Sequence, residues 1–73
     1  MNMVANIFEA ERSKLMSLCY RMLGERAGAE GVVQDTWLKW AAADIDNIDN
    51  PAAWLRRVAT NIAIDTLRSA HRQ

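Results

Sequence analysis

Side chains suited to contact with single-stranded nucleic acid follow one helical stripe near the C-terminus of this 73-residue chain. The stripe consists of Trp54, Arg57, Asn61, Arg68 and Arg72, with Ile64 and Asp65 at its margins. An indole ring stacks on a base, a guanidinium pairs with phosphate, and a carboxamide hydrogen-bonds a base edge. The pattern therefore favours binding to unpaired bases. The alternative is an ordinary solvated helix face with Trp54 covering the core.

A second set of side chains shares a helical face in the middle of the chain. Its members are Gly31, Gln34, Asp35, Leu38 and Ala42. Small residues allow another helix to approach closely, Leu38 offers an apolar anchor, and Gln34 and Asp35 offer polar groups. The spacing predicts a docking strip for a partner helix. The alternative is again a solvated face, because a single exposed Leu is common.

Residue types that catalyse reactions are sparse in this sequence. The one His, His71, lies near the C-terminus, and the one Cys, Cys19, falls on an apolar helical face, where we expect a buried thiol. The carboxylates lack the spacing of a metal site or an acid–base pair, and no Gly-rich phosphate loop is present. We therefore expect no enzymatic activity, no metal site, no cofactor and no small-molecule substrate.

Helical periodicity predicts the elements that position these side chains. In the first helix, one apolar face is formed by Phe8, Leu15, Leu18, Cys19 and Met22. This helix should end at Leu23, because Gly24 can adopt the left-handed conformation that closes a helix. A second helix should begin near Gly28, which we place at its N-cap. Its core face is formed by Ala29, Val33, Thr36, Trp37 and Trp40, and the alanines at 41–43 continue it.

Residues 44–50 break the helical pattern, because their Asp and Asn side chains compete for backbone hydrogen bonds. Asn50 should cap a third helix, with Pro51 at its first position and an end near residue 71. Its core face is formed by Leu55, Val58, Ala59, Ile62, Ala63 and Ala70. Without any strand pattern, we predict one all-α domain of three helices over residues 1–73, with a short extra turn at the N-terminus or within residues 44–50.

Composition places further limits on the class of protein. Apolar residues make up 51% of the chain, which suffices for a small core. A single Cys cannot form an internal disulfide, and no apolar run is long enough to cross a membrane, so we expect a cytoplasmic protein. The net charge of zero divides into minus three over residues 1–50 and plus three over residues 51–73. A basic C-terminal segment indicates contact with a polyanion.

Two strings, in this order and spacing, resemble the second region of bacterial sigma factors, in the extracytoplasmic-function group of the sigma-70 family. The first string is Glu30-Gly31-Val32-Val33-Gln34-Asp35-Thr36-Trp37-Leu38-Lys39-Trp40, and the second is Pro51-Ala52-Ala53-Trp54-Leu55-Arg56-Arg57-Val58-Ala59-Thr60-Asn61. Tyr20-Arg21-Met22-Leu23-Gly24 and the ending Asp65-x-Leu67-Arg68 are also similar to family members. The resemblance covers residues 15–72.

This resemblance implies a transcription-initiation domain. Its first string would dock on the paired clamp helices of the largest RNA polymerase subunit, through Gly31, Gln34, Asp35 and Leu38. Its second string would help to melt the promoter and hold the non-template strand of the minus-ten element. The implied DNA-binding residues are Lys39, Trp54, Arg57, Asn61, Asp65, Arg68 and Arg72. The implied partners are the RNA polymerase core, promoter DNA and an anti-sigma protein.

Two features qualify what the resemblance implies. The family usually has an Asp where this chain has Gly31, so we expect weaker polymerase binding. The C-terminal domain with which such factors read promoter DNA is absent from these 73 residues.

Two other classes of function remain open. A helix-turn-helix reader of duplex DNA usually joins its helices by a turn of about three or four residues, whereas residues 44–50 form a seven-residue connection. A protein-interaction domain without a DNA role would tolerate the loss of Arg57 and Arg68.

Overall fold

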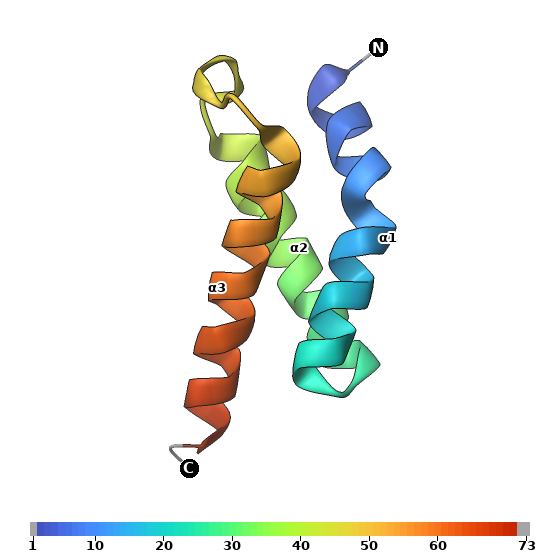
Figure 1. The fold of residues 1–73 in the computed structure, drawn as a ribbon, viewed down its shortest axis with the longest axis vertical. Helices are drawn as coiled ribbons and strands as arrows, with labels where there is room; N and C mark the ends of the chain where they lie inside the picture. Colours follow the sequence, from blue (N-terminus) through green and yellow to red (C-terminus); the bar gives the residue numbers. More distant parts are fainter. Residues whose placement is uncertain (1, 72–73) are drawn as a thin grey trace.

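Three helices form the framework of the computed structural model, which describes residues 2–71. They are α1 (Met3–Leu23), α2 (Arg26–Ala42) and α3 (Pro51–His71), and a 3-10 turn, η1 (Ile45–Asn47), lies between α2 and α3. The helices α1 and α3 run in the same direction, and α2 runs against both (Figure 1). The described residues contain no strand. The predicted all-α fold of three helices is therefore confirmed, and the extra turn lies within residues 44–50.

Both ends of α1 are closed by caps. The Asn2 Oδ1 accepts a hydrogen bond of 3.0 Å from the Val4 amide at the first turn. At the other end Gly24 has a φ of 78° and donates its amide to the Tyr20 carbonyl at 2.8 Å. A side chain at that φ would strain the backbone, which is why glycine suits this position. The predicted end at Leu23 is confirmed.

The start of α2 differs from the prediction. The helix begins at Arg26 after Glu25, whose extended backbone (φ −144°, ψ 150°) makes it the N-cap, so the placement of Gly28 at the N-cap is wrong. The two residues Gly24 and Glu25 suffice to reverse the chain, and Gly28 falls within the first turn. An ion pair of 3.1 Å from Arg26 to Glu30 spans that turn.

The start of α3 agrees with the prediction. The Asn50 Oδ1 accepts a hydrogen bond of 3.1 Å from the Ala53 amide, and Pro51 is the first helical residue. In the connection before it, Ile45 and Ile48 pack against the core. Apolar contacts therefore hold the α2–α3 connection against the core of the domain.

The core lies where all three helices meet. Its buried residues are Phe8, Leu15 and Cys19 of α1, Ala29, Val32, Val33, Thr36 and Trp40 of α2, and Leu55, Ala59 and Ala63 of α3. The polar groups among them are satisfied. The Trp40 Nε1 donates to the Val4 carbonyl at 2.8 Å, which joins the end of α2 to the start of α1, and the Thr36 Oγ1 donates to the Val32 carbonyl at 2.8 Å.

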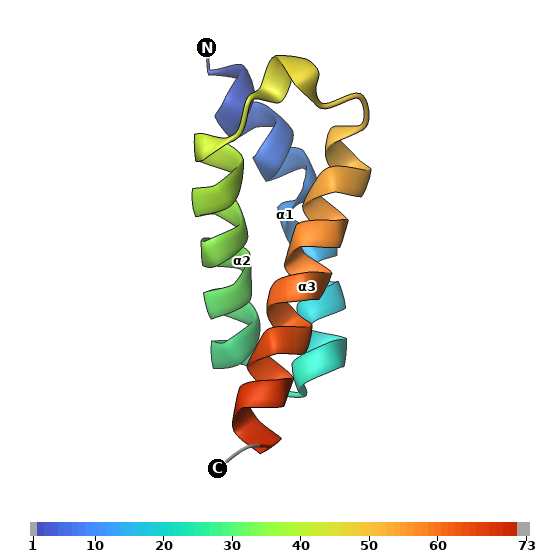
Figure 2. The same ribbon diagram turned by 90° about the vertical axis from the view of Figure 1, so that its left-hand side faces the viewer.

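Several predicted core positions are less buried than the periodicity indicated. Ala70 is exposed, so its assignment to the core is wrong. The last turns of α3 extend past the connection between α1 and α2, where neither helix can cover them (Figure 2). Val32 is buried although its burial was not predicted. Five predicted core residues are only half-buried: Leu18, Met22, Trp37, Val58 and Ile62.

Candidate functional site

The outer face of α2 presents the predicted docking strip to solvent. Gly31, Gln34, Asp35 and Leu38 are all exposed. Leu38 is 58% exposed, so its apolar side chain protrudes into solvent between the polar groups. Neither Gln34 nor Asp35 forms a side-chain hydrogen bond with another described residue. The strip therefore offers a free amide, a free carboxylate and an apolar anchor on one helix face.

The same string of α2 also supplies the core, because residues three and four apart share one face of a helix and the residues between them lie on the other. Val32, Val33 and Thr36 are buried between the exposed positions of the strip. Their burial fixes the rotation of α2 about its axis, and hence the direction in which Asp35 and Leu38 point. The strip is thus held on a rigid element rather than on a loop.

Trp54 lies at the edge of the core. Its ring centroid is 5.5 Å from that of Trp40, with the planes tilted by 56°. The side chain is half-buried and packs against the core, so Trp54 does cover the core in part. It also lines a groove of about 370 Å³. The other lining residues are Asn47, Ile48, Asp49, Asn50, Ala53 and Arg57.

This groove beside Trp54 combines groups that suit a planar base. An indole ring can stack on it and the Arg57 guanidinium carries a positive charge. The Asn47 and Asn50 side chains add amide groups, although the Asn47 Nδ2 already donates to Asp44 and the Asn50 Oδ1 already caps α3. The two asparagines come from the α2–α3 connection and were not among the predicted site residues. Their only signal in the sequence was the Asp- and Asn-rich composition of residues 44–50.

The remaining residues of the predicted DNA stripe are spread along α3. Arg57, Asn61, Asp65 and Arg68 are exposed. The Arg68 Nη1 is 4.0 Å from the Asp65 Oδ1, and both side chains are at least 70% exposed, so this ion pair holds neither group tightly. Arg72 lies outside the described residues. Lys39 is exposed on α2 and does not line the groove beside Trp54.

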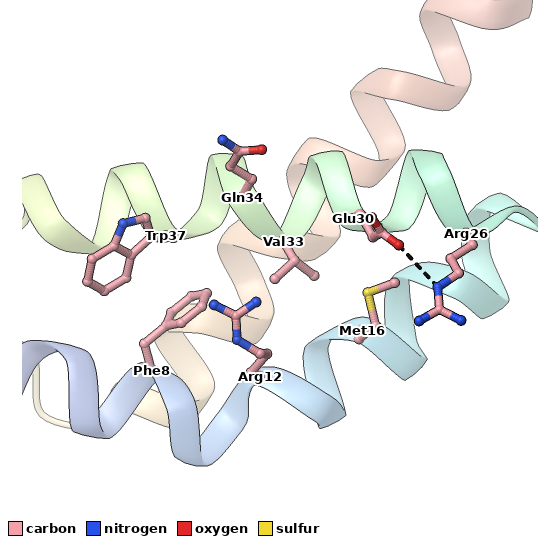
Figure 3. A pocket seen from close by; sticks show the side chains of 8 residues that line it. All are labelled: Phe8, Arg12, Met16, Arg26, Glu30, Val33, Gln34 and Trp37. Atoms are coloured by element: carbon pink, nitrogen blue, oxygen red, sulfur yellow. Dashed lines mark hydrogen bonds and ion pairs between the residues drawn. The ribbon is translucent and has the colours of Figure 1, made fainter.

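A groove of about 490 Å³ between α1 and α2 was not predicted. Its lining residues are Phe8, Arg12, Met16, Arg26, Glu30, Val33, Gln34 and Trp37 (Figure 3). The rings of Phe8 and Trp37 meet edge to face at 5.2 Å, and the Arg12 guanidinium carbon lies 5.5 Å from the Phe8 centroid. Sequence reasoning missed this groove because it forms only where two helices pack.

The one Cys and the one His of the sequence lie in different surroundings. Cys19 is fully buried, and burial raises the pKa of its thiol, which keeps the sulfur protonated and unreactive. His71 is exposed at the end of α3. Within residues 2–71, no three His, Cys, Asp or Glu side chains gather where they could hold a metal ion. No described helix combines the length and apolarity needed to span a membrane.

Comparison with known families agrees with the arrangement of the two strings. A family model described as Sigma-70 region 2 matches residues 7–73. The chain belongs to the sigma-70 region 2 family. In this region 2 domain, the first family string lies within α2, with the predicted docking strip outside and Val32 and Val33 inside, and the second string forms the first half of α3.

Relatives of this region 2 domain are named as extracytoplasmic-function (ECF) factors. The ECF RNA polymerase sigma factor SigJ of Mycobacterium tuberculosis is 48% identical over 67 residues, covering 90% of this chain and 21% of the relative. The ECF RNA polymerase sigma factor SigW of Bacillus subtilis is 39% identical over 67 residues, covering 88% of this chain and 35% of the relative. The chain thus spans only a part of each relative. No solved structure matches it.

Proposed function

We propose that this domain acts in transcription initiation, by docking on the clamp helices of the largest RNA polymerase subunit and by holding the melted non-template strand of the minus-ten promoter element. The outer strip of α2 is the polymerase surface, and the exposed face of α3 is the DNA surface. The observation that carries the proposal is how the family string on α2 divides between core and surface. Val32 and Val33 are buried, whereas Gln34, Asp35 and Leu38 are exposed. The same domain is a target for an anti-sigma protein.

The polymerase surface is supported by its chemistry. A protruding Leu38 flanked by unpaired polar groups fits a helical partner that buries the Leu and pairs with the Asp35 carboxylate. Gly31 allows close approach but lacks the carboxylate that the family usually has there. Binding should therefore rely on Asp35 more than in factors that have both acids.

A calorimetric titration against a purified clamp-helix fragment tests the polymerase surface. Asp35→Arg should abolish binding, because it reverses the charge at the centre of the strip. The matched control is Asp46→Arg, which makes the same charge change at an exposed position of η1. Loss of binding in both variants, or in neither, would count against docking through the α2 strip.

The DNA surface is supported by the groove beside Trp54 and by the exposed Arg57 and Asn61 that follow it on α3. A flat ring, amide groups and a guanidinium suit a base that has left the duplex, whereas a paired base cannot enter a groove of this kind. At low salt we therefore expect tighter binding to single-stranded than to duplex DNA in fluorescence-anisotropy titrations. Equal affinity for both forms would contradict the strand-holding role.

A further inference from the structure

A third groove, of about 490 Å³, lies between α1 and α3 and carries an excess of positive charge. Its lining residues are Glu11, Ser13, Lys14, Leu15, Ser17, Leu18 and Arg21 of α1, with Ala52 and Arg56 of α3. Three cations, Lys14, Arg21 and Arg56, thus share the groove with one carboxylate. None of them belongs to the predicted DNA-binding residues, because periodicity within single helices could not place α1 beside α3.

The cations of this α1–α3 groove have no anionic partner among the described residues. Ion pairs do form elsewhere, from Arg12 to Glu9 at 2.9 Å and from Arg26 to Glu30 at 3.1 Å. The side chains of Lys14, Arg21 and Arg56 are exposed and form no such pair within residues 2–71. Their charge is therefore available to an external anion.

The chemistry of the groove favours phosphate over a protein helix. Ser13 and Ser17 add hydroxyl donors, and guanidinium groups match phosphate oxygens in geometry. A docking helix would need an apolar anchor point. The two leucines that line the groove offer little of this, because Leu15 is buried and Leu18 is half-buried. The large hydrophobic side chains that are exposed among the described residues, Met3, Tyr20 and Leu38, do not line it.

Two consecutive arginines of α3 divide between this groove and the groove beside Trp54. Arg57 lines the groove beside Trp54, and Arg56 lines the α1–α3 groove. We infer that the α1–α3 groove binds the sugar-phosphate backbone of the single strand whose base enters the groove beside Trp54. The inference rests on the proposed DNA-holding function, and it extends the DNA surface from α3 onto α1.

The test measures how the affinity of the 73-residue chain for a fluorescein-labelled oligothymidylate depends on salt. For single strands, the logarithm of the association constant falls linearly with the logarithm of the salt concentration, and each neutralised phosphate adds about 0.7 to the steepness of this slope. The variant Lys14→Gln/Arg21→Gln should therefore lower the slope by about 1.4, and adding Arg56→Gln should lower it further. All three side chains are exposed, and Gln keeps good helix propensity, so circular dichroism should remain unchanged.

The matched control is Arg12→Gln/Arg26→Gln, which removes the same charge from the α1–α2 groove. This control should leave the salt slope unchanged. An equal decrease of the slope in both double variants would mean that only the net charge of the domain matters, and would overturn the inference. If the α1–α3 variant keeps the slope while Arg57→Gln weakens binding, the inference fails but the proposed function stands. If the unmodified chain does not bind the oligonucleotide, both fail.

A variant that gains affinity provides a second test, because a misfolded protein would lose affinity for DNA. Glu11→Gln removes the one carboxylate of the groove and should raise the affinity for the oligonucleotide several-fold at low salt. An unchanged or lower affinity would overturn the inference. Weaker binding of the Lys14→Gln/Arg21→Gln variant to the clamp-helix fragment, with unchanged DNA binding, would overturn it too and assign the groove to a protein partner.

Discussion

Gly31 stands where the resemblance to the family implies an Asp. It lies in the middle of α2, is exposed, and an added Cβ would have no atom within 4 Å. Packing therefore does not require a glycine here, in contrast to Gly24, whose φ of 78° does. A glycine inside a helix costs stability, so its presence at this position needs a reason other than the fold.

Gly31→Ala should raise the free energy of unfolding by about 1 kcal/mol, because alanine is the better helix former and no neighbour obstructs it. Urea denaturation followed by circular dichroism measures the change. Gly24→Ala is the control and should have the opposite sign, since its backbone conformation disfavours a side chain. A loss of stability at position 31 would show that this segment of α2 is not an ordinary exposed helix.

Gly31→Asp should tighten binding to the clamp-helix fragment, because it restores a carboxylate beside Gln34 and Asp35 on the proposed polymerase surface. The calorimetric titration described above measures it, and Gly31→Asn is the uncharged control of similar size. Equal affinity of the two variants would mean that charge at this position does not contribute.

The attachment of α2 to α1 depends on Trp40. The ring is fully buried, and its Nε1 donates to the Val4 carbonyl at 2.8 Å, across 36 residues of sequence. The same ring packs against Trp54. Trp40 thus links the start of α1, the end of α2 and the start of α3, which carries the groove beside Trp54.

Trp40→Phe should lower the free energy of unfolding by about 2 kcal/mol, since it removes a buried hydrogen bond and leaves a small cavity. Thermal and urea denaturation measure the loss. Trp37→Phe is the matched control and should cost less, because Trp37 is only half-buried and its ring nitrogen forms no hydrogen bond with a described residue. Equal losses would argue against a special role for the Trp40–Val4 contact.

The two proposed binding surfaces lie on different helices of the domain. The polymerase strip belongs to the outer face of α2, and the DNA surface belongs to α3 and the connection before it. A domain with a long axis of 41 Å can present both at once. The two surfaces share the core but no exposed residue.

We therefore expect the two binding activities to be separable. Asp35→Arg should abolish binding to the clamp-helix fragment and leave the affinity for single-stranded DNA within about twofold, because sites without shared partners behave additively. Arg57→Gln should weaken binding to single-stranded DNA and leave the affinity for the clamp-helix fragment within about twofold. Calorimetry and fluorescence anisotropy on the same protein samples measure both. Loss of both activities in either variant would contradict separate surfaces.

Much of this architecture follows from local patterns in the sequence. Gly24 ends α1 and Asn50 caps α3 because both effects involve only a few neighbouring backbone groups. The exposure of Gln34, Asp35 and Leu38 follows from helical period once the opposite face is apolar. The N-cap of α2 was predicted wrongly, because it depends on how few residues can connect α1 to α2. The burial of Ala70 was predicted wrongly, because it depends on how far the neighbouring helices extend beside α3.

Three helices, the Gly24 cap of α1, the Asn50 cap of α3 and the faces that remain polar could be predicted from the sequence, because each depends on interactions within a few turns of one chain segment. Which faces meet depends on how the helices pack. This packing placed Trp54 against Trp40, brought Asn47 and Asn50 beside Arg57, and aligned α1 with α3 so that Lys14, Arg21 and Arg56 line one groove. A groove forms between two packed helices, and the periodicity along one helix does not indicate which helix lies beside it.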